Sequence, residues 1–258
     1  MTQLRVALLQ TDPVWQAPEE NRQQLAKQLA DISDCDLIVL PEMFTAGFGS
    51  DPKRFSEPAD GETFQWMMQT AEQCQSAICG SYGVDVGDSV GNRLVWCEPD
   101  GSHAFYDKRH LFRMAGEHKR YISGRERLLV DYRGWRINPQ VCYDLRFPVW
   151  CRNRGDYDLQ IFVANWPGAR RHAWRTLLQA RAIENQAYVI GVNRTGVDPK
   201  GLDYTGDSLV ISPEGDILVD AGDVAGTYTA TLDLTSMQAF RERFPTHLDA
   251  DAFEITFD

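Results

Sequence analysis

Residues 159–192, LQIFVANWPGARRHAWRTLLQARAIENQAYVIGV, decide the fold class. The run 159–164 has the apolar character of a buried strand, and the segment after it, 165–167, contains a proline that breaks the strand. Residues 172–186 carry apolar side chains at helical spacing, and 188–192 returns to a strand pattern. A strand, a helix and a strand in this order predict a βαβ unit.

The N-terminal part has the same order of elements. Strands are expected over 4–9 and 36–40, with a helix over 19–32 between them. The second strand, DLIVL, is continuously aliphatic, as in strands covered on both faces, and it stops before Pro41. A further helix is expected through residue 71, with Asp60 as its N-cap.

Hairpins are expected in the middle and at the end of the chain. Turn residues at 99–101 and 213–215 separate short strand patterns. The remaining expected elements are strands at 77–84, 93–98, 103–106, 135–141, 208–212, 216–219 and 228–232, and helices at 148–152 and 236–243. This mixture predicts an α/β fold with mixed sheets and helices on the outside. No low-complexity linker or short repeat divides the chain, so one domain over residues 1–258 is expected.

Charge and hydropathy limit the possible partners. The net charge of −11 disfavours nucleic acid and anionic membranes. No apolar run approaches the roughly 18 residues of a membrane span, and the first residues lack the pattern of a secretory signal, so we expect a cytoplasmic protein. Residues 105–154 nevertheless hold twelve Lys and Arg against five acidic residues. This basic segment indicates either binding of a small anion or solvated loop arginines.

The cysteines and histidines do not indicate a metal site. Six cysteines stand at positions 35, 74, 79, 97, 142 and 151. A chain of this length does not need disulfides, and no zinc-ligand spacing occurs. The five histidines show no HxxxH spacing, and we find no haem or nucleotide signature. We therefore expect no cofactor and no metal, and buried thiols for most of the cysteines.

Three reactive side chains each follow the end of an expected strand: Glu42, Lys108 and Cys142. Clefts in α/β sheets form at strand ends, so these side chains can meet in one site. A thiol, a carboxyl proton carrier and a fixed positive charge are what acyl transfer requires. A sharp turn after Cys142 would offer the backbone N–H of Tyr143 to an oxyanion, and a nearby cation would lower the pKa of the thiol.

Other interpretations remain open from these residues alone. Cys142 can be a packed thiol, and Glu42 and Lys108 can reach water from their strand ends. A Cys–His hydrolase could use His110 or His172 as its base. A third alternative is an inactive protein that binds a small molecule without catalysis.

The segments PEMF (41–44), YDKRHLF (106–112) and CYDLRFP (142–148) together resemble the three signature segments of the nitrilase superfamily, the carbon–nitrogen hydrolases. The resemblance continues through GEHKRYISG (116–124), VANWP (163–167) and QARAIENQAYVIGVNRTG (179–196), so it covers nearly the whole chain. Within the superfamily, the chain is most similar to small bacterial ω-amidases. The implied fold is a nitrilase-like αββα sandwich that pairs into a homodimer.

The resemblance also implies roles for single residues. Cys142 would attack the amide carbon, and Glu42 would carry the protons. Lys108 and the N–H of Tyr143 would hold the oxyanion, and Glu117 would orient Lys108 or the substrate amide. Val149 stands where many relatives have an acidic residue, which removes any ionic contact from that position.

The implied reaction is hydrolysis of the carboxamide C–N bond of small dicarboxylate monoamides, such as 2-oxoglutaramate to 2-oxoglutarate and ammonia, through a cysteine thioester. Nitrile and N-carbamoyl hydrolysis use the same triad and remain alternatives. Arg146 is a candidate for binding a free carboxylate of the substrate, although it can equally serve a structural ion pair. Trp166 is a candidate for the pocket wall.

Overall fold

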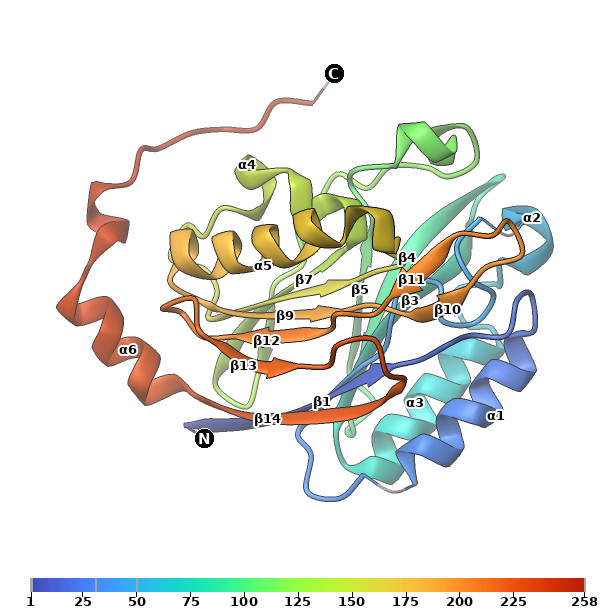
Figure 1. The fold of residues 1–258 in the computed structure, drawn as a ribbon, viewed down its shortest axis with the longest axis horizontal. Helices are drawn as coiled ribbons and strands as arrows, with labels where there is room; N and C mark the ends of the chain where they lie inside the picture. Colours follow the sequence, from blue (N-terminus) through green and yellow to red (C-terminus); the bar gives the residue numbers. More distant parts are fainter. Residues whose placement is uncertain (1, 31, 50, 258) are drawn as a thin grey trace.

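The computed structural model describes residues 2–30, 32–49 and 51–257. Within these ranges the chain forms two mixed six-stranded sheets and a two-stranded hairpin (Figure 1). The strands of the first sheet, in spatial order, are β14 (Gly226–Asp233), β1 (Gln3–Gln10), β2 (Leu37–Val39), β3 (Ala77–Val86), β4 (Ser89–Cys97) and β5 (His103–Asp107). Those of the second are β13 (Ile217–Asp220), β12 (Leu209–Ile211), β9 (Tyr188–Val192), β8 (Leu159–Val163), β7 (Trp135–Val141) and β6 (Val130–Tyr132). The expected α/β class with mixed sheets is confirmed.

Helices cover the outer faces of the two sheets (Figure 1). The first sheet packs against α1 (Pro18–Leu29) and α3 (Glu62–Cys74), and the second packs against α5 (Arg171–Asn185). The other helical elements are α2 (Pro52–Phe55), α4 (Pro148–Cys151), α6 (Leu234–Arg243), and the 3-10 turns η1 (Arg113–Ala115), η2 (Glu117–Lys119), η3 (Cys142–Arg146), η4 (Gly168–Arg170) and η5 (Thr246–Asp249). None of the described helices is long and apolar enough to cross a membrane.

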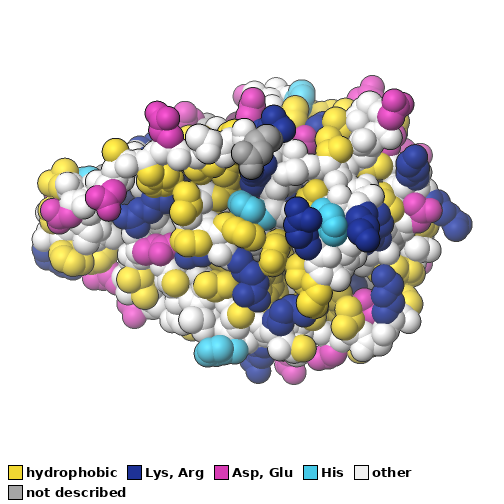
Figure 2. All heavy atoms as spheres, turned by 90° about the horizontal axis from the view of Figure 1, so that it is seen from above, with side chains coloured by type: hydrophobic (Ala, Val, Ile, Leu, Met, Phe, Trp, Pro, Cys, Tyr) yellow, Lys and Arg dark blue, Asp and Glu magenta, His cyan; other side chains and the backbone are white. Residues whose placement is uncertain are grey.

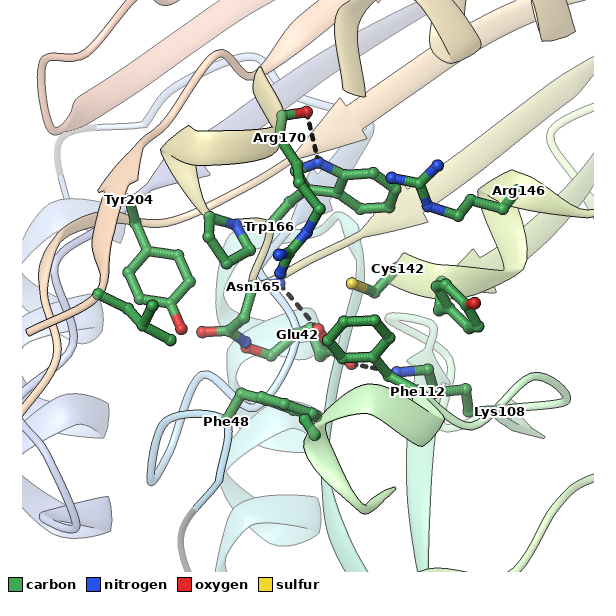
Figure 3. A pocket seen from close by; sticks show the side chains of 14 residues that line it. Glu42, Phe48, Lys108, Phe112, Cys142, Arg146, Asn165, Trp166, Arg170 and Tyr204 are labelled. Carbon is green, nitrogen blue, oxygen red and sulfur yellow. Dashed lines mark hydrogen bonds and ion pairs between the residues drawn. The ribbon is translucent and has the colours of Figure 1, made fainter. Parts of the chain in front are cut away.

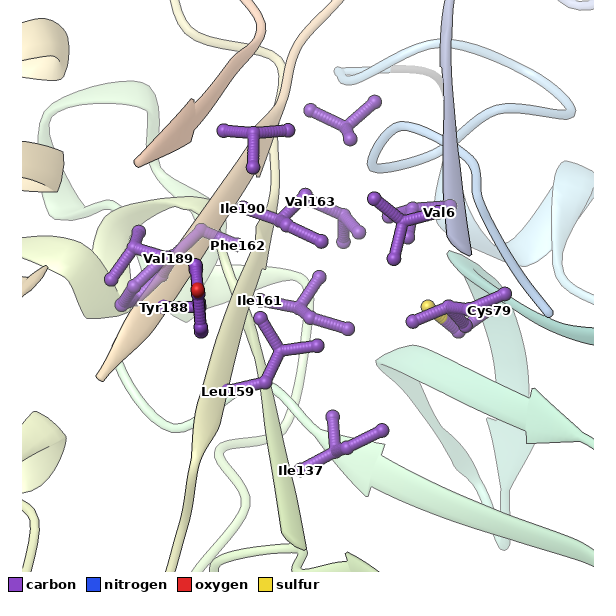
Figure 4. Packing of buried hydrophobic residues seen from close by; sticks show 14 of the residues in the cluster. Val6, Cys79, Ile137, Leu159, Ile161, Phe162, Val163, Tyr188, Val189 and Ile190 are labelled. Atoms are coloured by element: carbon purple, nitrogen blue, oxygen red, sulfur yellow. The ribbon is translucent and has the colours of Figure 1, made fainter. Parts of the chain in front are cut away.

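The main core lies between the two sheets. In Figure 4, Val6 and Cys79 of the first sheet face Ile137, Leu159 and Ile161 of the second. All of these side chains are almost completely excluded from solvent. Burial of apolar surface on this scale is the main stabilising contribution to the fold, and it fixes the two sheets face to face.

The expected βαβ unit is present. Strands β8 and β9 pair in parallel, with Leu159 opposite Tyr188, and α5 forms the connection between them. Gly191 on β9 allows α5 to pack closely, because a Cβ there would lie 2.5 Å from a methyl carbon of Leu178. The strand that precedes Glu42 is also confirmed: β2 is buried and pairs in parallel with β1 and β3.

Several local predictions were wrong. Helix α1 ends at Leu29, three residues earlier than expected. Asp60 is not an N-cap: Gly61 holds that position, and the Glu57 carboxylate accepts the Thr63 N–H at 2.7 Å instead. Strand β6 and the hairpin of β10 (Thr195–Val197) and β11 (Asp203–Thr205) were not predicted. These three-residue strands are too short for a recognisable alternation of polar and apolar residues.

Candidate active site

One pocket lies where strand ends of the two sheets meet (Figure 3). With its mouth it encloses about 490 Å³, a size that suits a small molecule. The residues that line it are Glu42, Phe48, Lys108, Phe112, Ala115, Cys142, Tyr143, Arg146, Asn165, Trp166, Pro167, Arg170, Leu202 and Tyr204. Every site residue predicted from the sequence is among them except Glu117, which contacts Lys108.

Strand ends place the reactive groups, as the sequence indicated. Glu42 follows β2 and Lys108 follows β5, both in the first sheet. Cys142 follows β7 and Trp166 follows β8, both in the second sheet. The pocket is therefore built from both sheets, and its geometry depends on how they pack.

Lys108 lies between two carboxyl groups. Its Nζ is 2.9 Å from Oε1 of Glu42 and 3.0 Å from each carboxyl oxygen of Glu117, and all three side chains are buried. Burial alone would lower the pKa of Lys108, but the carboxylates of Glu117 and Glu42 outweigh it and raise this pKa well above its ordinary value. Lys108 therefore stays an ammonium group with a fixed position.

Asn92, a buried residue of β4, joins the same cluster. Its Nδ2 donates to Oε1 of Glu42 at 2.8 Å and to Oε1 of Glu117 at 3.2 Å. The Asn165 N–H donates to the other oxygen of Glu42 at 2.8 Å. Each of these contacts brings an N–H donor to a carboxyl oxygen, which fits ionised glutamates. Two carboxylates around one ammonium leave a net charge of −1 in this buried cluster.

Cys142 begins η3 directly after β7, with a backbone φ of +47°. This left-handed conformation is unusual for a side chain other than glycine and makes the turn sharp. In Figure 3 the sulfur points into the pocket beside Glu42. The helix predicted over 148–152 is confirmed as α4, with Phe147 at its N-cap position, and the turn η3 before it was not predicted.

The predicted lowering of the pKa of Cys142 was wrong. Burial and then the carboxylate of Glu42 raise this pKa well above the ordinary value, and Lys108 only partly opposes them. The thiol therefore holds its proton. A neighbouring base has to remove that proton before the sulfur can attack a carbonyl carbon.

Asp144 holds the turn that carries Cys142 and Tyr143. Its carboxylate accepts the Val141 N–H at 3.1 Å and the Tyr106 hydroxyl at 2.8 Å. The Tyr143 N–H lies in the first turn of η3, where backbone donors have no carbonyl one turn earlier to bind. This amide can therefore face a ligand oxygen.

Neither histidine of the Cys–His alternative lines the pocket. His110 uses Nδ1 to contact Asp144 at 2.7 Å, and its ring stacks on Phe147 with centroids 3.7 Å apart. His172 is exposed near the start of α5. His110 therefore helps to position the turn, and it does not line the pocket beside Cys142.

Several arginines of the basic segment form structural ion pairs. Arg127 pairs with Asp156 and Arg136 with Asp158. Arg146 differs, because its guanidinium lies over the Trp166 ring, with Cζ 4.8 Å from the centroid, and lines the pocket. The Val149 side chain is exposed. Local ion pairs thus account for part of the basic composition of the segment.

The six cysteines are all free. Four of them, including Cys142, are buried, which confirms that most are packed thiols. Among the residues that the structure describes, no group of three or more His, Cys, Asp or Glu side chains could hold a metal ion.

Sequence reasoning missed Asn165 and Arg170, which line the pocket, and Asn92, which binds Glu42 and Glu117. Asn165 follows β8 directly, so the rule that selected Glu42 would have selected it too. Asn92 could have been noticed because it is an amide side chain in β4, whose other residues are mostly buried and apolar. Arg170 lies in a short turn whose direction the sequence does not indicate.

Comparisons with known proteins agree with this geometry. A family model described as carbon–nitrogen hydrolase matches residues 5–242. The chain is 48% identical to the omega-amidase YafV of Escherichia coli (strain K12), over 99% of this chain and 100% of that protein. It is 32% identical to the 2-oxoglutaramate amidase of Bacillus subtilis (strain 168), over 95% and 96% of the two chains. The crystal structure of XC1258 from Xanthomonas campestris, a CN-hydrolase superfamily protein with an arsenic adduct in its active site, superposes with a TM-score of 0.97 at 47% identity, over 99% and 100% of the two chains.

Proposed function

The chain belongs to the carbon–nitrogen hydrolase family and is an amidase that cleaves amide C–N bonds, and on this premise we propose that its substrates are small dicarboxylate monoamides such as 2-oxoglutaramate. The products of that substrate would be 2-oxoglutarate and ammonia. The names of the relatives from Escherichia coli and Bacillus subtilis support this substrate class. The pocket supports it as well, because it is small and carries arginine side chains.

The proposed mechanism uses Cys142 as nucleophile and Glu42 as proton carrier. Glu42 takes the thiol proton while sulfur bonds to the amide carbon, and a tetrahedral oxyanion forms. The C–N bond then breaks, Glu42 gives its proton to the leaving nitrogen, and ammonia departs from a thioester. Glu42 next takes a proton from water as the water attacks, and it returns this proton to sulfur when the C–S bond breaks. The observation that carries this mechanism is that a buried thiol, carboxylate and ammonium line one pocket.

Lys108 and the N–H of Tyr143 would stabilise the oxyanion. Lys108 is held at 2.9–3.0 Å from oxygens of Glu42 and Glu117, so its charge is preorganised before substrate arrives. In this scheme Glu117 orients Lys108 and does not exchange a proton with the substrate. We further propose that residues 1–258 form one domain and that this domain acts without a cofactor. We also propose that the protein is a cytoplasmic homodimer.

A substrate panel tests the proposed class. Ammonia release would be measured with 2-oxoglutaramate, succinamate, glutamine, N-carbamoyl amino acids and simple nitriles. We expect the highest kcat/KM for the first two, because each combines a primary amide with a distal carboxylate. Faster turnover of nitriles or N-carbamoyl compounds would refute the substrate class. Ammonia release from none of them would favour the inactive binding protein.

His110→Ala tests the Cys–His alternative. The variant loses the contact with Asp144 and the stacking on Phe147, so we expect a stability loss of about 1–3 kcal/mol. We expect kcat/KM for succinamate to stay within about tenfold of the wild-type value, because His110 does not line the pocket. Chemical denaturation and steady-state kinetics measure the two effects. A loss of kcat comparable to that of a nucleophile variant would support histidine as the base.

A further inference from the structure

Two arginines approach the mouth of the pocket from either side of Trp166 (Figure 3). The Arg170 side chain points into the pocket, with Cζ 5.2 Å from the centroid of the Phe112 ring. Its backbone carbonyl accepts the indole N–H of Trp166 at 2.9 Å, which fixes the turn η4. Arg146 lies over the face of the same indole. Aromatic contacts thus hold both guanidinium groups in place.

Neither guanidinium has an acidic partner in the part of the chain that the structure describes. The next arginines along the chain do have one: Arg171 pairs with Asp207 at 2.7 Å, and Arg175 pairs with Asp207 and Asp220. Arg146 and Arg170 are both partly buried, so each has lost part of its hydration. An anion bound between them would offset this loss of hydration.

The pocket itself does not supply that anion. Glu42 is the one acidic residue among the described side chains that line it. Its carboxyl oxygens already accept bonds from Lys108, Asn92 and Asn165. Two positive charges therefore remain uncompensated at the mouth. Figure 2 shows the upper side of the molecule as drawn in Figure 1, where Lys and Arg gather in the middle of the face and acidic side chains lie mostly towards its edges.

We propose that Arg170 is a specificity-determining residue, which binds, together with Arg146, the substrate carboxylate remote from the scissile amide. This inference rests on the proposed class of dicarboxylate monoamides. A guanidinium presents a planar pair of N–H donors that matches a carboxylate, and a bond to a charged partner is stronger than one between neutral groups. The amide end would then reach Cys142, and the carboxylate end would lie between the two arginines.

Succinamate and butyramide form a matched pair of substrates for the test. Both carry a primary amide followed by two methylene groups, and the carboxylate of succinamate is replaced by a methyl group in butyramide. The quantity to measure is the preference, defined as kcat/KM for succinamate divided by kcat/KM for butyramide. It would be determined for the wild type, Arg170→Gln, Arg170→Lys and Arg146→Gln. Arg113→Gln is the control, because it removes an exposed positive charge from η1 beside the pocket residues Phe112 and Ala115.

We expect Arg170→Gln to reduce the preference about ten- to a hundredfold, mainly through a higher KM for succinamate. Arg170→Lys should recover part of the loss, since it restores the charge without the planar fork. Arg113→Gln should keep the wild-type preference. An equal loss with both substrates would show that Arg170 has a structural role, and an unchanged preference would show that it does not contact the carboxylate. Either result would overturn the inference.

The same data separate this inference from the proposed function. A wild-type enzyme with the same kcat/KM for butyramide and for succinamate would refute the substrate class itself. A second outcome would refute only the role of Arg170 and leave the substrate class intact. In that outcome the wild type prefers succinamate, Arg146→Gln removes this preference, and Arg170→Gln keeps it.

Discussion

Replacement of Cys142 by serine is expected to reduce kcat/KM for succinamate by at least about a thousandfold while the protein stays folded. The hydroxyl is a much weaker acid than the thiol, so Glu42 would have to remove a proton that is held far more strongly. The oxygen is also a poorer nucleophile towards the amide carbon. Serine fits the space of cysteine, so the turn at φ +47° should persist. Steady-state ammonia release measures the loss, and circular dichroism checks the fold.

Cys151→Ser is the matched control. This second buried thiol contacts Oε1 of Gln140 and the carbonyl oxygen of Asp144, and a hydroxyl can donate to the same oxygens. We expect its activity to remain close to the wild-type value. Intact-mass analysis with substrate should detect an acyl adduct on the wild type and on the control, but not on Cys142→Ser. A Cys142→Ser enzyme with wild-type turnover would exclude this sulfur as the nucleophile.

The second large effect is expected for Glu42→Gln, which removes the proton carrier but keeps the shape of the side chain. Turnover should fall about a hundred- to ten-thousandfold, because both thioester formation and thioester hydrolysis depend on this carboxylate. The variant should also be less stable by about 1–3 kcal/mol. The NH2 group of the glutamine has to replace one of the two carboxyl oxygens of Glu42. It would then face other donors, either Lys108 and Asn92 or the Asn165 N–H.

Rapid-quench mass spectrometry separates the two steps for this variant. We expect slow appearance of the acyl adduct as well as slow turnover. Glu57→Gln is the control, since Glu57 accepts bonds from Thr63 outside the pocket and should tolerate the change without loss of kcat. Normal acylation followed by a persistent adduct would restrict Glu42 to hydrolysis. Near-normal activity would remove it from the mechanism.

The larger elements of the fold could be predicted because the spacing of their apolar residues indicates which side chains are buried. The aliphatic runs in β2, β8 and β9 lie in strands with neighbours on both sides, and the periodic apolar positions of α5 face the second sheet. The cap of α3 could not be predicted, because the Glu57 carboxylate that binds its first turn comes from the loop before the helix, outside the N-cap position. The hairpin of β10 and β11 depends on pairing between segments that are too short to show a period.

The sequence was sufficient to select three side chains that line one pocket, but not to predict their electrostatics. Strand ends and the family resemblance identified Glu42, Lys108 and Cys142 as candidates for one site. The pKa of Cys142 was predicted in the wrong direction, because the desolvation of a side chain depends on how completely two sheets enclose it. The role of Asn92 as a bridge between two carboxylates likewise requires coordinates, since β4 gives no sign of which neighbours its buried side chains meet.

The proposed mechanism moves charge only within the buried enclosure that holds Glu42, Lys108, Glu117 and the Cys142 sulfur. When Glu42 accepts the thiol proton, a negative charge disappears from the carboxylate and appears on sulfur within the same enclosure. The total charge of the enclosure is conserved, so activation requires neither a counter-ion nor a proton from bulk water. Between turnovers the sulfur rests in its neutral form, which peroxides oxidise slowly compared with a thiolate. The proposed nucleophile would thereby stay chemically protected until an amide arrives.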